Sequence, residues 1–201
     1  MKLRWLVIPL TVVTLAFIVA GAWLMPQHTF AGVVQAPPKD ASDFSMSDET
    51  GRKFALSDLR GEWIMLAYGY TTCPDVCPAT LAHLAEVKRQ LGADAKHVKV
   101  VFVTVDPERD TSEVLARYVR KFDAEFKGLT GTPAEVAAAA QAYGARYLRV
   151  ETQSAAGYLM SHSAFVYVID PQFRHRLTFP FGLASQEMAA DLKYLMTKKE
   201  N

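Results

Sequence analysis

Apolar residues along the chain gather in short runs whose spacing alternates between that of strands and that of helices. Two continuous apolar runs indicate strands buried on both faces, at residues 62–70 and 97–105. Helical spacing marks four further segments, at 78–91, 111–124, 133–143 and 185–198. Short alternating runs predict a hairpin around Gly51, a hairpin across 145–161, and strands at 163–170 and 173–179. Strands and helices that alternate in this order predict an α/β sandwich with a mixed central sheet.

An uncharged segment, residues 5–25, follows the basic residues Lys2 and Arg4. It has about the 20 residues that a helix needs to cross a bilayer, so we expect a transmembrane helix with residues 1–4 in the cytoplasm. A cleaved signal peptide is the alternative, although its apolar segment would normally be shorter. Either interpretation exports the rest of the chain. In a bacterium the domain would then lie in the oxidising periplasm, and a retained helix would hold it at the inner membrane.

Residues 26–41 contain Pro37-Pro38 and no amphipathic period, and we expect them to form a linker. Residues 42–201 are expected to form one domain, because half of the 201 residues are apolar and can supply one substantial core. The net charge is only +1, from 22 basic and 21 acidic residues, and no basic stripe is present. This charge pattern argues against a nucleic-acid partner.

The two cysteines of the chain, Cys73 and Cys77, both lie in the segment YGYTTCPDVCP at residues 68–78. Pro78 fits the first turn of a helix, where its missing N–H costs nothing, so we place Cys77 at the helix cap and Cys73 on the loop before it. Both sulfurs then lie near the positive end of the helix dipole, which favours the thiolate form. Their place after a buried strand is the sheet edge where α/β proteins carry their chemistry.

The cysteine spacing alone is compatible with a structural disulfide, a redox couple or a soft-metal site. A disulfide across so short a loop adds little stability. A peroxiredoxin-like peroxidase would need a threonine at position 70, which is Tyr70. A metal site needs a third donor, and His162 is the candidate because it stands where the chain enters a buried strand, although a histidine there also commonly serves as a hydrogen-bonded turn residue. Two thiolates and an imidazole suit Cu(I) and can hold Cu(II), whereas structural zinc would require a fourth ligand.

Four motifs occur in one order along the chain: YTTCPDVCP at 70–78, VTVDPERDT at 103–111, GLTGT at 128–132 and HSAFVYVID at 162–170. Together they resemble the Sco/SenC family, whose members are membrane-anchored, thioredoxin-like copper proteins that serve cytochrome c oxidase assembly. The resemblance extends over about Asp43–Lys198 and also to the N-terminal anchor.

The resemblance implies a thioredoxin-like fold and a copper site made of Cys73, Cys77 and His162, which would bind Cu(I), Cu(II) or both. It implies a metallochaperone that delivers copper to the dinuclear CuA site of the oxidase and that also reduces cysteines of its partner. Expected partners are cytochrome c oxidase subunit II or another copper chaperone. The sequence departs from the family at Ser161, where an acidic residue commonly precedes the ligand histidine, and this puts copper transfer or partner identity in doubt.

A thiol–disulfide oxidoreductase or a redox sensor that uses Cys73 and Cys77 is the alternative function. Thioredoxin-like oxidoreductases carry a proline where the strand beside the active site begins, and this chain has His162-Ser163 there. The missing proline favours copper binding over disulfide exchange. We expect Asp106–Asp110 to act mainly in the structure, as a turn after a strand and, through Asp110 or Thr111, as a helix cap.

Overall fold

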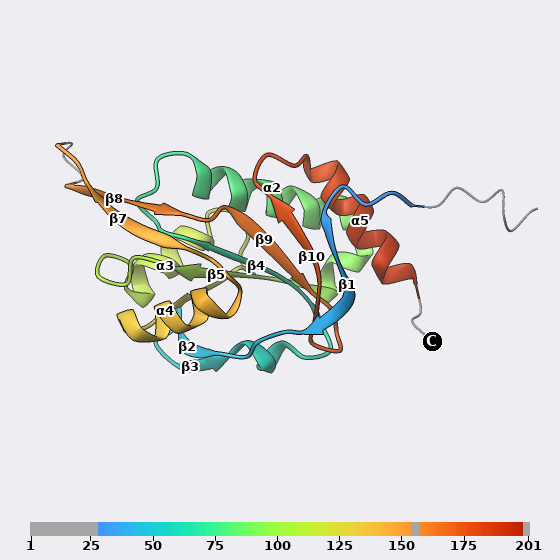
Figure 1. Cartoon of the computed structure of the whole chain (residues 1–201), viewed down its shortest axis with the longest axis horizontal. Coiled ribbons are helices and arrows are strands. Elements are labelled where there is room, and N and C mark those ends of the chain that lie inside the picture. The colour runs from blue at the N-terminus through green and yellow to red at the C-terminus, as the bar shows by residue number, and fades with distance from the viewer. Residues whose placement is uncertain (1–27, 154–156, 199–201) are drawn as a thin grey trace, which may run out of the picture.

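An eight-stranded mixed sheet forms the centre of the molecule (Figure 1). The computed structural model describes residues 28–153 and 157–198. The strands lie in the order β1-β10-β9-β4-β5-β6-β2-β3, in which β4, β5 and β6 are parallel and the other neighbours antiparallel. Their bounds are β1 Val33–Asp40, β2 Ser45–Asp48, β3 Lys53–Ala55, β4 Trp63–Gly69, β5 Val98–Thr104, β6 Lys127–Thr130, β9 Phe165–Ile169 and β10 Arg174–Pro180.

Helices cover both faces of this sheet, which confirms the predicted α/β sandwich (Figure 1). They are α2 Val76–Leu91, α3 Ser112–Val119, α4 Pro133–Ala142 and α5 Ser185–Thr197, with short 3₁₀ turns at Leu56–Leu59 and Gly92–His97. On one face α2 packs against α5, and Tyr118 of α3 contacts Phe102 of β5. On the other face the Tyr68 hydroxyl donates to the Ala139 carbonyl of α4, 2.7 Å away.

Strand β4 is buried along its whole length, as its continuous apolar run predicted. It pairs in parallel with β5, and α2 makes the connection between them. A parallel connection of this kind brings the end of β4 and the start of α2 to the same edge of the sheet. The segment that contains both cysteines therefore follows a strand that is buried along its whole length.

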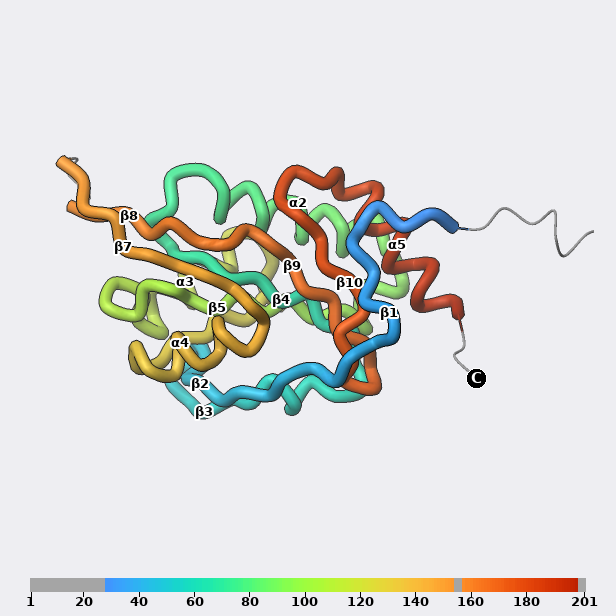
Figure 2. The backbone as a smooth tube through the Cα atoms, in the orientation of Figure 1, coloured from blue at the N-terminus to red at the C-terminus, as the bar shows by residue number. Residues whose placement is uncertain are grey.

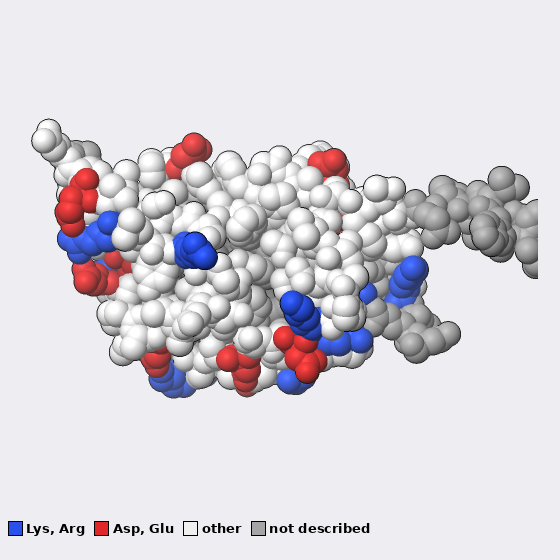
Figure 3. Space-filling model, viewed as in Figure 1, with Lys and Arg blue, Asp and Glu red and all other residues white. Residues whose placement is uncertain are grey.

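A separate two-stranded sheet, β7 Tyr147–Glu151 with β8 Tyr158–His162, projects from the body as a hairpin (Figure 2). It joins β9 directly but forms no ladder with the main sheet. Basic and acidic side chains gather over this end of the molecule (Figure 3), where Arg149 pairs with Glu108 at 3.2 Å and with Glu151 at 2.7 Å. The hairpin predicted for 145–161 is confirmed, and β8 extends one residue further to include His162.

Element boundaries differ from those predicted in several places, among them β1, α2 and α3. Val33–Asp40, assigned to the linker, forms edge strand β1 against β10, so the fold begins before residue 42. Helix α2 begins at Val76, two residues early, and Pro78 is still in the first turn, where it costs no hydrogen bond. Helix α3 ends at Val119 instead of 124, because an Asp123 turn leads the chain into the buried Phe126.

The expected transmembrane helix at 5–25 and the cytoplasmic residues 1–4 lie outside the described residues. Within 28–153 and 157–198, no helix is both long enough and apolar enough to cross a bilayer. The anchor therefore stays a prediction.

Candidate metal centre

The two cysteine side chains lie where β4 gives way to α2, with unequal exposure. Cys77 is in the first turn of α2 and is 2% exposed, while Cys73 is half-buried on the preceding loop. The Cys77 backbone N–H donates to Cys73 Sγ at 3.4 Å. Because this N–H belongs to the first turn of α2, it has no partner within the helix, and the Cys73 sulfur supplies one. Both thiols are free, so the pair is available as donors.

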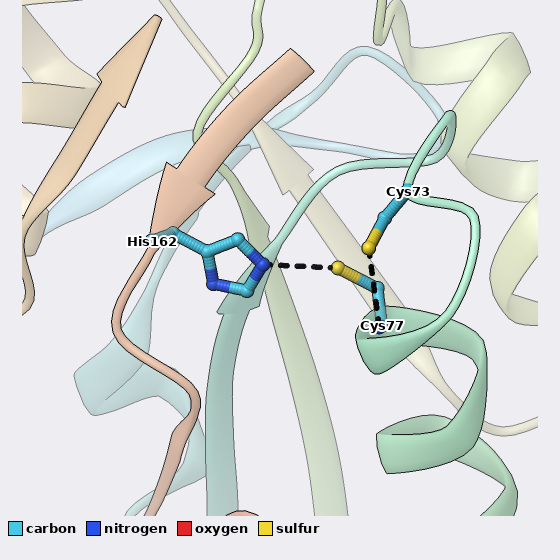
Figure 4. Close-up of side chains that lie close together, drawn as sticks. All are labelled: Cys73, Cys77 and His162. Atoms are coloured by element: carbon cyan, nitrogen blue, oxygen red, sulfur yellow. Dashed lines mark hydrogen bonds between the residues drawn. The ribbon is translucent and has the colours of Figure 1, made fainter. Parts of the chain in front are cut away.

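His162 ends β8 and directs its ring toward the cysteines (Figure 4). Its Nδ1 lies 3.0 Å from the carbonyl oxygen of Ser163. A carbonyl can only accept, so Nδ1 carries the proton of the neutral ring and Nε2 carries the lone pair. Nε2 lies 3.2 Å from Cys77 Sγ. The nitrogen that could ligate a metal therefore already faces the sulfur.

The structure brings all three predicted ligand residues together. The ligand atoms of Cys73, Cys77 and His162 all lie within 4.8 Å of one another. Among the residues described, no other His, Cys, Asp or Glu joins this group. Two sulfurs and one imidazole nitrogen form a soft donor set of low coordination number, which fits Cu(I) best among common biological metals. A structural zinc site would want one more protein ligand.

The two thiols differ in acidity because each affects the other. A hydrogen bond from the Cys77 side chain lowers the pKa of Cys73 to about 3. The same contact raises the pKa of Cys77, and burial raises it further. At neutral pH the pair therefore holds one thiolate and one proton, and repulsion and desolvation oppose loss of the second proton. A bound cation would offset both costs.

Gly69, the last residue of β4, leaves room for the buried sulfur. A Cβ at this position would lie 2.8 Å from Cys77 Sγ and 2.7 Å from Cε2 of Phe102. Neither neighbour can retreat easily, because both are buried. Gly69 was not predicted as a site residue. Its position next to the cysteine motif could have identified it.

Asp110 fixes the loop between β4 and α2, residues 70–75, which we call the cysteine loop. It was not predicted as a site residue. Its carboxylate accepts from the Thr71 N–H at 2.9 Å, the Thr71 hydroxyl at 2.5 Å and the Thr104 hydroxyl at 2.6 Å. The side chain is 0% exposed. Of the two predicted helix caps, Thr111 caps α3 through its bond with the Val114 N–H, whereas Asp110 fixes the start of the loop that presents Cys73. Its place in the acidic segment 106–110, which follows a buried strand, could have identified Asp110 as a site residue.

Ser161 lies on the opposite face of β8 from His162. Side chains alternate along a strand, and in the register Leu148 pairs with Ser161 while Tyr147 pairs with His162. Ser161 is exposed. An acidic residue at this position would therefore point away from the sulfurs. The orientation of the imidazole is set by the Ser163 carbonyl instead, so the departure from the family pattern leaves the donor geometry unaffected.

Comparison with known proteins identifies the family. The model of the SCO1/SenC family matches residues 34–197. The chain belongs to the SCO1/SenC family. Among relatives of this family, a SCO2-like protein of Rickettsia felis is 30% identical over 203 residues, which cover 96% of this chain and 99% of the relative. The mitochondrial SCO2 homologue of Homo sapiens is 36% identical over 161 residues, 75% of this chain and 60% of the human protein.

Solved structures of SCO1/SenC proteins share the fold. The copper-bound ScoI of Bradyrhizobium japonicum matches with a TM-score of 0.70 and 37% identity, covering 77% of this chain and 98% of that protein. The solution structure of apo Sco1 from Thermus thermophilus matches with a TM-score of 0.76 and 36% identity, covering 84% and 98%. The thioredoxin-like α/β class that the motifs implied is thereby confirmed. The matched region spans 49% to 60% of the length of the mammalian relatives.

Proposed function

We propose that this protein is a metallochaperone that binds a single copper ion between Cys73, Cys77 and His162 and delivers it during cytochrome c oxidase assembly. The observation that carries the proposal is the convergence of three soft donors within 4.8 Å. Membership of the SCO1/SenC family and the copper found in the Bradyrhizobium japonicum relative support the choice of metal.

The arrangement suits transfer of the metal as well as binding. Cys77 is buried, whereas Cys73 and His162 are both half-buried and form the side of the site that solvent can reach. A donor atom of a partner could approach from this side and displace the imidazole first, while the buried thiolate still holds the ion. Ligands would then exchange one at a time, and the metal would never be released to water.

Copper transfer tests this proposal directly. The reduced domain is loaded with Cu(I), competed against a chromophoric Cu(I) chelator to obtain affinity and stoichiometry, and mixed with the soluble copper domain of oxidase subunit II. We expect one copper per chain and movement of copper to subunit II. Absence of tight Cu(I) binding by the fully reduced domain would refute the proposal. A subunit II that takes up copper equally fast from the free chelate would refute the delivery role.

A thiol–disulfide reductase is the second candidate function, and the lowered pKa of Cys73 is the observation that favours it. The Cys73 thiolate would attack a disulfide of the partner, and Cys77 would then displace the partner's sulfur. The partner would leave as a dithiol, while Cys73 and Cys77 would form a disulfide that an external thiol reductant must reduce. Reduction of oxidised subunit II by stoichiometric metal-free domain, lost in Cys77→Ala, would support this role.

We also propose that residues 5–25 hold the domain at the periplasmic face of a bacterial inner membrane. The uncharged length of this segment and the preceding Lys2 and Arg4 support the orientation. Alkaline phosphatase fused after residue 41 should be active and should remain in the membrane fraction. Release of the fusion as a soluble, N-terminally shortened protein would show a cleaved signal peptide instead.

A further inference from the structure

Tyr158, the first residue of β8, is clamped between two arginine side chains. The guanidinium carbons of Arg109 and Arg149 each lie 3.7 Å from the centroid of its ring. Its hydroxyl donates to Asp106 Oδ1 at 2.9 Å, and its carbonyl accepts from Arg109 Nη1 at 3.1 Å. Asp106 is 3% exposed and also forms an ion pair with Arg109. The cation–π and charge-assisted contacts converge on one ring and attach this end of the hairpin to the body of the protein.

The hairpin needs such an attachment because its own ladder is short. A two-stranded sheet is marginally stable by itself, and β7 and β8 form no ladder with the main sheet. At its base the hairpin is tied by Arg146 and Ser163, whose backbone and hydroxyl groups bond reciprocally at 2.8 and 3.0 Å. The clamp on Tyr158 holds the other end of β8. Without it, the base alone would set the orientation of β8.

Tyr158 and His162 lie on the same face of β8. They are four residues apart in a strand, so both side chains point to the side that faces the cysteine loop. Arg109 also lies over the ring of Tyr70, 5.8 Å from its centroid, and Tyr70 contacts the His162 ring edge to face at 5.9 Å. The contacts that hold Tyr158 and the imidazole of His162 therefore belong to one continuous packed layer between the hairpin and the cysteine loop.

The loop Asp106–Asp110 touches both halves of the metal centre. Through Asp110 it fixes Thr71 at the start of the cysteine loop, and through Asp106 and Arg109 it fixes Tyr158 on the hairpin. The spacing between the sulfurs and the imidazole thus depends on a loop that contains no ligand.

We propose that Tyr158 is a positioning residue for His162: its clamp on Asp106 and Arg109 fixes the inner face of β8 and so determines how fully the imidazole takes part in copper binding. The inference rests on the proposed function, since it concerns the same site. It adds a second residue on β8, four positions from the ligand, to the set that controls copper affinity.

The test compares Tyr158→Phe and Tyr158→Ala with Leu159→Ala, a neighbour on the opposite face of the same strand. We expect Tyr158→Ala to weaken Cu(I) binding about tenfold and Tyr158→Phe, which keeps the ring but loses the hydroxyl, about threefold. Leu159→Ala should bind as the unaltered protein does. Equal affinity in the unaltered protein and both Tyr158 variants would overturn the proposal. Should Tyr158→Ala fail to fold, Tyr158→Phe alone decides.

A double-mutant cycle separates positioning from general stabilisation. If Tyr158 acts through the imidazole, Tyr158→Phe should have no further effect on Cu(I) affinity in a His162→Ala background. The same threefold loss in both backgrounds would overturn the proposal, because the hydroxyl would then act independently of His162.

A readout without copper distinguishes failure of this inference from failure of the proposed function. The imidazole ¹⁵N chemical shifts of His162 in the reduced, metal-free protein report its tautomer and its contact with Cys77. We expect a single Nδ1–H tautomer in the unaltered protein and in Leu159→Ala, and partial averaging of the two nitrogen shifts in Tyr158→Phe. Unchanged shifts would overturn the clamp even where copper binds. Averaged shifts in a protein that binds no copper would uphold the clamp and refute only the chaperone.

Discussion

The sulfur side and the histidine side of the metal centre come from regions of very different construction. Cys77 lies at the head of α2, directly after a strand buried along its whole length in an eight-stranded sheet. His162 lies on a two-stranded hairpin whose outer face leaves Leu148 67% and Val150 43% exposed. Stability in proteins is not uniform, and segments with few buried contacts open first. The sulfurs are thus positioned by the core, whereas the imidazole lies on a peripheral hairpin that side-chain contacts hold against the body.

This difference fits the proposed transfer of copper to a partner protein. A ligand on a peripheral hairpin can leave and return without disturbing the core, while the buried Cys77 and the half-buried Cys73 keep the ion bound. Changes on the sulfur side should therefore affect both the stability of the fold and copper binding, whereas changes on the hairpin should affect copper binding alone.

Removal of both sulfurs, by Cys73→Ser with Cys77→Ala, should have the largest effect. Structural metal sites with four ligands bind with about 10–16 kcal/mol, or roughly 3 kcal/mol per ligand. Loss of two thiolates should therefore weaken Cu(I) binding by at least about a thousandfold, measured by chelator competition. Retention of tight binding in this variant would mean that copper is held elsewhere on the chain.

Asp110→Ala should destabilise the sulfur side most. It leaves the buried Thr104 hydroxyl and two half-buried donors of Thr71 without their carboxylate partner, at a cost of roughly 3 kcal/mol in the free energy of unfolding. Urea denaturation of the reduced, metal-free domain measures this. The matched hairpin variant Leu148→Ala should change stability by no more than about 0.5 kcal/mol. If the two variants were equally destabilised, the contrast between the regions would fail.

Gly69→Ala should disturb the packing around the buried Cys77 sulfur. The new Cβ would lie within 3 Å of both Cys77 Sγ and the Phe102 ring, and overpacking of this kind costs about 1–3 kcal/mol. We expect a lower urea midpoint and a displaced Cys77, seen as weaker Cu(I) binding. Normal stability together with normal affinity would show that the core around the sulfur yields more easily than the packing indicates.

The reactivity of the two thiols should differ with pH. Because the folded-state pKa of Cys73 is lowered to about 3, its thiolate persists as the pH falls from 8 to 5, so its alkylation rate should change by less than about twofold. Cys77, whose pKa is raised, should react slowly throughout. Peptide mass analysis after brief iodoacetamide treatment distinguishes the two. A Cys73 rate that falls about tenfold per pH unit below 8 would show an ordinary thiol.

The main sheet and the donor set could be predicted from sequence because their signals are local or repeated. The continuous apolar run of β4 indicates burial on both faces, and Thr132-Pro133 marks the start of α4. The cysteine spacing allowed several kinds of site and His162 was the candidate third donor, but the four motifs together were needed to decide for copper at these three residues.

The remaining features depend on contacts between distant segments. Strand β1 contains Pro37-Pro38 and lacks a clear period, yet its place at the sheet edge against β10 tolerates both. Asp110 and Asp106 read as a turn and a cap in the sequence, since their partners Thr71 and Tyr158 lie 39 and 52 residues away. Pairings at such separations leave no periodic trace in a single sequence.

X-ray absorption of the Cu(I)-loaded domain counts the donors around the metal and so shows whether His162 is one of them. We predict two sulfur and one nitrogen neighbours in the unaltered protein. In His162→Ala we predict two sulfurs without the nitrogen, an affinity about a hundredfold lower and an unchanged urea midpoint. An identical spectrum and affinity in the two proteins would contradict the account.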